Sequence, residues 1–186
     1  MKKVCILGLG YIGLPTALKL AEYKYKVLGI DIKQDHIKKI QKGLLDFKEE
    51  DLNKLFKKII LQDNFKVSIK PEESDIYIIA VPTPFLKKIE EYPKPDISFV
   101  IAAIKSITNL LKKGDLVIIE STCPVGTTEK LEKVIFQLSG LNRKEVNIAY
   151  CPERVLPGNT LHELINNNRI IGGLTNIASQ KALTFI

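Results

Sequence analysis

The sequence lacks the features of a secreted, membrane-spanning or disulfide-stabilised protein. It contains no tryptophan, one methionine and three cysteines in 186 residues. Three is an odd number and the spacing does not resemble that of metal ligands, so we expect no disulfide framework, no metal site and a reducing, cytoplasmic location. No apolar run approaches the roughly 18 residues needed to span a membrane. The N-terminus leads directly into a predicted strand and not into a signal peptide.

The net charge of +7 has two explanations. It could indicate a nucleic-acid-binding protein, but the lysines are spread through predicted amphipathic helices, such as residues 33–42 and 54–58. This spread favours solvated helix faces, so we expect neither a nucleic acid nor a membrane as partner. A positive field would also attract an anionic nucleotide. The 45% hydrophobic and 26% charged residues are ordinary for a globular domain of this length.

The strongest pattern lies in the first 31 residues. It consists of a predicted strand, a glycine-rich turn, a helix, a second strand and an acid, at residues 4–7, 8–13, 14–23, 27–30 and Asp31. In the turn, Gly8 permits a sharp bend, Gly10 lets a pyrophosphate approach the backbone, and Gly13 lets the helix pack closely on the strand. The helix N-terminus offers N–H groups to phosphates. The pattern predicts a dinucleotide site.

Asp31 selects the cofactor in this interpretation. It lies 31 − 8 = 23 residues after the first glycine, near the ~20 expected for an acid that binds the adenosine ribose hydroxyls. A carboxylate there would repel a 2′-phosphate, so NAD is favoured over NADP, although Lys33 nearby softens that preference slightly.

The rest of the chain alternates between helices and strands. Helices are expected at 34–42, 49–59, 97–111, 124–138 and 177–186, and strands at 65–69, 75–81, 116–120 and 146–150. Asp96 is expected to cap the third of these helices, and Pro124 to occupy the first turn of the fourth. This order predicts an α/β fold, a Rossmann-type doubly wound parallel sheet with strand order 3-2-1-4-5-6, possibly extended by further strands.

Polar side chains follow three of the predicted strands, where ligands of such sheets bind. Thr83 follows the fourth strand directly after Val81-Pro82, Thr122 follows the fifth, and Glu153 follows the sixth. Each has an alternative structural role: the threonines could bond their own backbone, and Glu153 could form an ion pair with Arg154. Their occurrence beside a glycine fingerprint favours a site.

Four segments together resemble the UDP-glucose/GDP-mannose dehydrogenase family, in its UDP-N-acetyl-D-mannosamine dehydrogenase branch. They are GLGYIGLPTA (8–17), AVPTPF (80–85), ESTCPVG (120–126) and CPERVLPG (151–158). The resemblance extends from Val4 to about Leu174. Two positions depart from the family pattern: Pro157 stands where a second glutamate occurs in the glucose-oxidising branch, and His36 stands where some members have lysine.

The resemblance implies an oxidoreductase of nucleotide-sugar metabolism and polysaccharide biosynthesis. Such enzymes oxidise the C6 hydroxyl of a UDP-sugar to a carboxylate with NAD, in two hydride transfers, through a thioester on a cysteine. It implies that the NAD contacts are Gly8, Gly10, Tyr11, Ile12, Gly13, Asp31, Val81, Thr83 and Thr122. It further implies a catalytic role for Thr122 and Glu153, substrate contacts from Arg154 and Val155, and a homodimer at full length.

The resemblance also implies that residues 1–186 are the NAD-binding domain, without the downstream central helix, substrate domain and nucleophilic cysteine. The 186-residue chain alone is then expected to bind NAD without turnover. Cys5, Cys123 and Cys151 are expected to be small apolar fillers. The alternatives left open are an NAD-binding module without catalysis and a dehydrogenase of another nucleotide sugar, namely UDP-glucose, UDP-N-acetylglucosamine or GDP-mannose.

Overall fold

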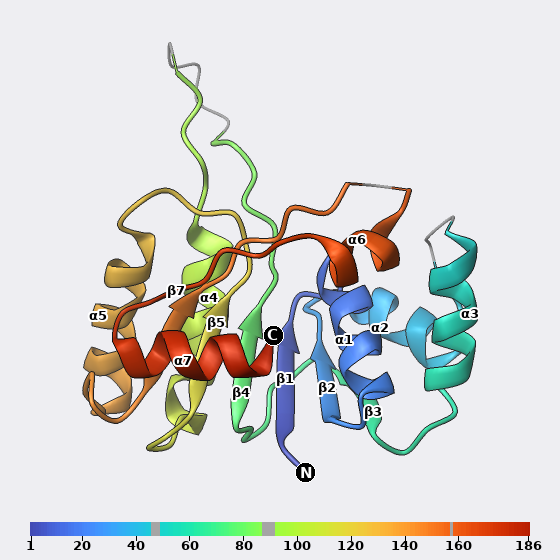
Figure 1. The fold of residues 1–186 in the computed structure, drawn as a ribbon, viewed down its shortest axis with the longest axis horizontal. Helices are drawn as coiled ribbons and strands as arrows, with labels where there is room; N and C mark the ends of the chain where they lie inside the picture. The colour runs from blue at the N-terminus through green and yellow to red at the C-terminus, as the bar shows by residue number, and fades with distance from the viewer. Residues whose placement is uncertain (46–48, 87–91, 157) are drawn as a thin grey trace.

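The computed structural model describes residues 1–45, 49–86, 92–156 and 158–186. In these residues, seven strands form one sheet in the order β3-β2-β1-β4-β5-β6-β7 (Figure 1). The strands are β1 (Lys3–Leu7), β2 (Lys26–Ile30), β3 (Phe65–Ser68), β4 (Ile76–Ile79), β5 (Leu116–Ile119), β6 (Asn147–Tyr150) and β7 (Gly172–Gly173). The helices are α1 (Gly13–Glu22), α2 (Gln34–Gln41), α3 (Glu50–Ile59), α4 (Ser98–Ile107), α5 (Thr127–Ser139), α6 (Thr160–Asn166) and α7 (Asn176–Phe185).

The predicted fold class and strand order are confirmed. Strands β1 to β6 are parallel in the order 3-2-1-4-5-6, and β7 extends the sheet antiparallel to β6. The predicted helix starts agree with the structure to within one residue except that of α5, which was predicted three residues too early. Helix α5 begins at Thr127 and not at Pro124, because Gly126 adopts a left-handed conformation (φ +84°) that a helix cannot include. Helix α4 begins at Ser98, whose N–H donates to the Asp96 carboxylate at 2.8 Å, so the acid caps the helix from one residue further out.

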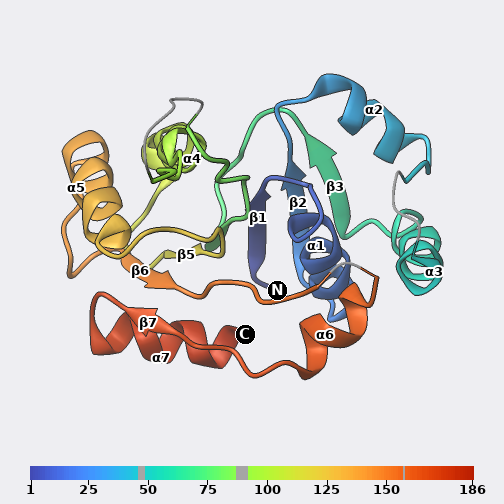
Figure 2. The same ribbon diagram turned by 90° about the horizontal axis from the view of Figure 1, so that it is seen from above.

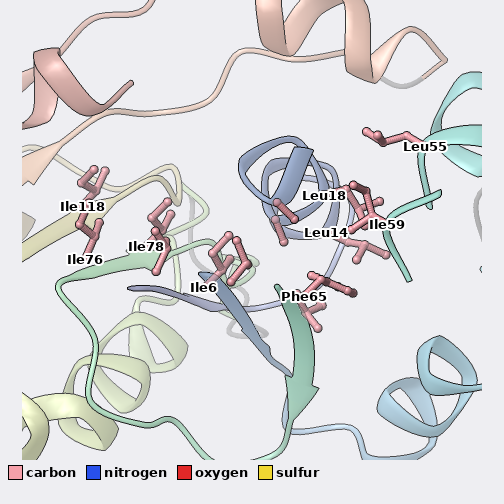
Figure 3. Packing of buried hydrophobic residues seen from close by; sticks show 14 of the residues in the cluster. Ile6, Leu14, Leu18, Leu55, Ile59, Phe65, Ile76, Ile78 and Ile118 are labelled. Carbon is pink, nitrogen blue, oxygen red and sulfur yellow. The ribbon is translucent and has the colours of Figure 1, made fainter. Parts of the chain in front are cut away.

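The central strands β1, β4 and β5 are buried on both faces, and each face of the sheet has its own core. Helices α4 and α5 cover one face, while α1, α6 and α7 lie on the other (Figure 2). Alternate residues of one strand therefore join different clusters: Val4 and Ile6 of β1 pack towards α1, whereas Cys5 and Leu7 pack towards α4 and α5. The α1 side is shown in Figure 3, where Ile6, Ile78 and Ile118 line up along neighbouring strands beside Leu14 and Leu18 of α1. Near-continuous apolar strands are the expected result of this two-sided burial.

The glycine turn between β1 and α1 packs against the end of β4. A Cβ on Gly8, which has φ +96°, would lie 2.5 Å from the Ala80 carbonyl oxygen. A Cβ on Gly13 would lie 1.9 Å from the Gly8 carbonyl oxygen. Around Gly10, in contrast, no atom lies within 4 Å of the Cβ position. Gly8 and Gly13 thus permit internal packing, whereas Gly10 leaves a surface that a ligand can approach.

This difference predicts opposite outcomes for two alanine substitutions in this chain. Gly13→Ala should lower the free energy of unfolding by about 1–3 kcal/mol or more, the usual cost of overpacking. Gly10→Ala should leave it within about 1 kcal/mol of the parent value, because the methyl group meets open space. Urea denaturation followed by circular dichroism measures both changes. Equal stability of the two variants would contradict the packing described for the turn.

Candidate functional site

Leu9, in the middle of the glycine turn, is held from the end of β2. Its N–H donates to Asp31 Oδ2 at 3.1 Å, and its carbonyl oxygen lies 2.9 Å from His36 Nε2. Asp31 Oδ1 accepts a hydrogen bond from the Lys33 N–H at 2.9 Å. The buried Leu9 side chain packs on Gly29, where a Cβ would lie 2.7 Å from a Leu9 methyl carbon. The predicted ribose acid therefore also holds the turn in place, and His36 contributes a second contact to the same residue.

A surface hollow of about 590 Å³ lies beside the glycine turn. Its lining consists of Gly10, Asp31, Lys33, Gln34, Asp35, His36 and Lys39. The volume lies in the range of small-molecule sites, and an acid and an accessible glycine border the same space. These features fit the adenosine ribose end of NAD. Lys33 and Lys39 bring positive charge to the rim, so discrimination against a 2′-phosphate rests on Asp31.

Strands β4 and β5 are neighbours in the sheet, so the loops that follow them, with Thr83 and Thr122, begin side by side. Ser121 joins the two loops, because its hydroxyl donates to the Val81 carbonyl oxygen at 2.7 Å. Thr83 is half-buried and Thr122 is exposed. Among the described residues, no hydrogen bond engages either threonine hydroxyl, so turn formation does not account for them. Both remain available to a ligand above the sheet.

Glu153 forms an ion pair, but not with the partner that its sequence neighbourhood suggested. Arg154 donates only its backbone N–H to Glu153 Oε1, at 2.7 Å, and the residue is exposed. The partner is Arg169, which lies between α6 and β7 and whose Nη1 is 3.1 Å from Glu153 Oε2. Arg169 Nη2 donates to Glu120 Oε1 at 2.7 Å and lies 3.3 Å from the Cys151 carbonyl oxygen. The alternative of a Glu153–Arg154 ion pair is therefore wrong.

Two carboxylates and one guanidinium thus meet below the loops that follow β5 and β6. The side chains of Glu120, Glu153 and Arg169 are 3%, 5% and 15% exposed. Burial raises the pKa of Glu120, and the Arg169 charge opposes that rise. Sequence reasoning missed Glu120 and Arg169. The sequence did contain a signal: Glu120 directly follows an apolar strand. A carboxylate buried there needs a neighbouring cation or a proton.

A second polar network joins the glycine turn to the loop after β6. The Tyr11 hydroxyl donates to Glu49, which precedes α3. Thr160 donates its N–H to Glu49 Oε2 at 2.9 Å and its hydroxyl to Glu49 Oε1 at 2.7 Å, and the Gly158 N–H donates to the Tyr11 oxygen at 2.8 Å. The Tyr11 hydroxyl is thus engaged within the protein, which leaves its main chain as the natural cofactor contact. Sequence reasoning did not identify Glu49.

The three cysteines are unlike reactive thiols. Cys5 and Cys151 are fully buried and Cys123 is half-buried. Burial raises the pKa of Cys5 to about 12 and that of Cys123 to about 11, and it also raises the pKa of Cys151. A nucleophilic cysteine needs the opposite environment. The structure agrees with their expected role as small apolar fillers.

Among the described residues, no group of three or more histidine, cysteine, aspartate or glutamate side chains could hold a metal ion. No helix in this part of the chain is long and apolar enough to cross a membrane.

Comparison with known proteins identifies relatives that match nearly the whole chain. The chain is 47% identical to UDP-N-acetyl-D-mannosamine dehydrogenase of Methanococcus aeolicus over 182 residues, 98% of this chain and 41% of the relative. It is 41% identical to NDP-N-acetyl-D-galactosaminuronic acid dehydrogenase of Ralstonia nicotianae, over 97% of this chain and 44% of the relative. The solved structure of the UDP-N-acetyl-mannosamine dehydrogenase Cap5O from Staphylococcus aureus superposes with a TM-score of 0.93 at 41% identity, covering 98% of this chain and 44% of that one.

The chain therefore spans less than half the length of these relatives. The family described as the UDP-glucose/GDP-mannose dehydrogenase family, NAD binding domain, matches residues 2–185, nearly the whole chain. The chain belongs to the UDP-glucose/GDP-mannose dehydrogenase family and constitutes its NAD-binding domain.

Proposed function

We propose that the protein oxidises the C6 hydroxyl of UDP-N-acetyl-D-mannosamine to the uronate, with residues 1–186 as the part that binds NAD. The relative with 47% identity is named UDP-N-acetyl-D-mannosamine dehydrogenase. The observation that carries the proposal is the hollow beside the glycine turn, which Gly10 and Asp31 line together. The 41% identity to an NDP-N-acetyl-D-galactosaminuronic acid dehydrogenase makes another N-acetylated hexose the alternative substrate.

The cofactor contacts follow from the positions of the residues. The backbone from Gly8 to Gly13, Tyr11 and Ile12 included, would hold the pyrophosphate, since a helix N-terminus attracts anions. Asp31 would accept hydrogen bonds from the adenosine ribose. Val81, Thr83 and Thr122, beyond the carboxyl ends of β4 and β5, would contact the nicotinamide half, in line with ligand binding at strand ends. NAD, when bound, supplies the acceptor for the hydride that leaves C6.

The remaining roles concern the nucleotide sugar. Arg154 and Val155 would contact it, since they lie on the loop after β6 and Arg154 is exposed. Thr122 and Glu153 would hold the water that attacks a thioester, because a carboxylate can accept the proton of such a water and a hydroxyl can orient it without adding charge. The nucleophilic cysteine would come from the part of the enzyme outside this chain. We place the full-length protein in the cytoplasm as a homodimer.

The cofactor assignment predicts that Asp31→Ala weakens NAD binding by about 1.5–3 kcal/mol, the range for charge-assisted hydrogen bonds. Binding of NADP should weaken less or not at all, because the lost carboxylate repels a 2′-phosphate. Isothermal titration calorimetry of the 186-residue chain measures both affinities. Asp63→Asn is the matched control, since this exposed acid lies between α3 and β3, does not line the hollow and should leave NAD affinity unchanged. A preference of the unmodified chain for NADP would overturn the assignment.

The water-holding role predicts that Glu153→Gln in the full-length enzyme slows thioester hydrolysis by roughly 10²–10⁴-fold, the usual worth of general-base catalysis. Intact mass spectrometry after quenching should show a sugar-nucleotide acyl adduct on the protein. Glu129 is an exposed acid in the first turn of α5. Glu129→Gln is therefore the control, and this variant should accumulate no adduct. A slow Glu153 variant with neither adduct nor NADH burst would instead assign Glu153 to the first oxidation step.

The thiol environments predict slow alkylation of the native 186-residue chain. At pH 8 the pKa of about 11 for Cys123 leaves roughly one thiolate in a thousand, and Cys5 and Cys151 are buried as well. Mass spectrometry with iodoacetamide should find Cys5 and Cys151 modified only after unfolding in guanidinium, and Cys123 modified slowly in the native chain. The slow native reaction should disappear in Cys123→Ser. A thiol that reacts faster than free cysteine would reveal a nucleophile within this chain.

A further inference from the structure

One guanidinium joins the two loops to which the proposed reaction assigns its catalytic groups. Glu120 directly follows β5 and precedes Thr122 by two residues, while Glu153 lies three residues after β6. Arg169 contacts Glu120 through Nη2 at 2.7 Å and Glu153 through Nη1 at 3.1 Å. We propose that Arg169 is a positioning residue for Glu153, and that it does so by bridging Glu153 to the rigidly held carboxylate of Glu120. This inference rests on the proposed function of Glu153.

The two carboxylates differ in how firmly the rest of the fold holds them. Glu120 is anchored in the sheet, because its N–H donates to the Ile79 carbonyl oxygen at 2.9 Å and its Oε2 lies 3.5 Å from the Thr16 hydroxyl of α1. Glu153 lies on a loop, and its N–H donates to the Glu120 carbonyl oxygen at 3.3 Å. In the described residues, Glu153 Oε2 is buried without a hydrogen-bond partner, and only the Arg169 charge lies beside it. The other oxygen, Oε1, accepts the Arg154 N–H at 2.7 Å, so Arg169 is the contact that orients Oε2.

The geometry requires arginine specifically. The guanidinium presents donors in a fixed planar fork, so that one group can serve two acceptors in different directions. A lysine ammonium is a single point charge and would pair with one carboxylate at a time. Without any cation, two buried carboxylates would face each other, which favours protonation of one or its displacement towards water. Glu153, on the loop, is the one that can move.

The test uses steady-state kinetics of the full-length enzyme with UDP-N-acetyl-D-mannosamine and NAD. Arg169→Lys keeps the buried charge but not the fork, and we expect kcat to fall about 10²-fold, the scale for an ångström of misplacement in a reacting group. KM for NAD should change much less than kcat, because neither Arg169 nor its two carboxylate partners line the hollow at Gly10 and Asp31. Arg143→Lys is the matched control: Arg143 pairs with the buried Glu132 on α5, away from these loops, and its substitution should leave kcat unchanged.

A double variant separates positioning from simple charge balance. Arg169→Met should lower both the melting temperature and kcat. Adding Glu120→Gln removes the carboxylate repulsion, so the melting temperature should recover while kcat stays low. Recovery of kcat together with stability, or wild-type kcat in Arg169→Lys, would overturn the inference. The proposed function fails separately, if the parent enzyme does not oxidise the sugar or if Glu153→Gln is fully active.

Discussion

The close packing of the glycine turn on the end of β4 is the constraint on which the rest of the structure depends. Ala80 and Gly8 lie so close together that no methyl group fits between them. Gly13, the first residue of α1, packs equally closely on Gly8. This contact sets where α1 begins and aims its N-terminus over the edge of the sheet. The hollow beside Gly10 and Asp31 exists because the turn is held there, with Leu9 contacted by Asp31 at the end of β2 and by His36 of α2.

The two polar networks lie at the same edge of the sheet as the glycine turn. Both core clusters are apolar, whereas the carboxyl ends of β5 and β6 carry a buried set of three charges, and the segment before α6 closes on Tyr11 and Glu49. Buried polar groups of this kind are costly unless every member finds a partner. Here the polar groups come from five separate loops, those after β1, α2, β5, β6 and α6, so they tie the loops together above an otherwise apolar sheet.

The sequence predicted the elements whose signal is local. Apolar runs of four or five residues, helical periodicity and the spacing of three glycines were sufficient for the strand order and the dinucleotide turn. The start of α5 was misjudged because a proline was treated as a fixed marker, while the left-handed backbone of Gly126 sets the actual boundary. The contribution of Gly29, which makes room for Leu9, was also hidden, because it depends on a side chain from another strand.

The polar networks could not be predicted for a related reason. Arg169 and Glu120 are 49 residues apart, and Glu49 and Thr160 are 111 apart, so no local spacing connects them. Glu153 shows the error this produces: its neighbour Arg154 seemed the natural partner, yet the chain turns that side chain outwards and brings Arg169 from the far side of α6.

The outermost strands of the sheet have a consequence for behaviour in solution. Strand β3 has four residues, with the exposed Lys66 among them, and β7 has only two, both glycine. A strand at the rim of a sheet can recruit another chain through its unpaired N–H and C=O groups, and short or charged rim strands suppress that pairing. With edge strands of this kind, the sheet offers few backbone groups for edge-to-edge aggregation. Its central strands, in contrast, are among the most apolar segments of the chain.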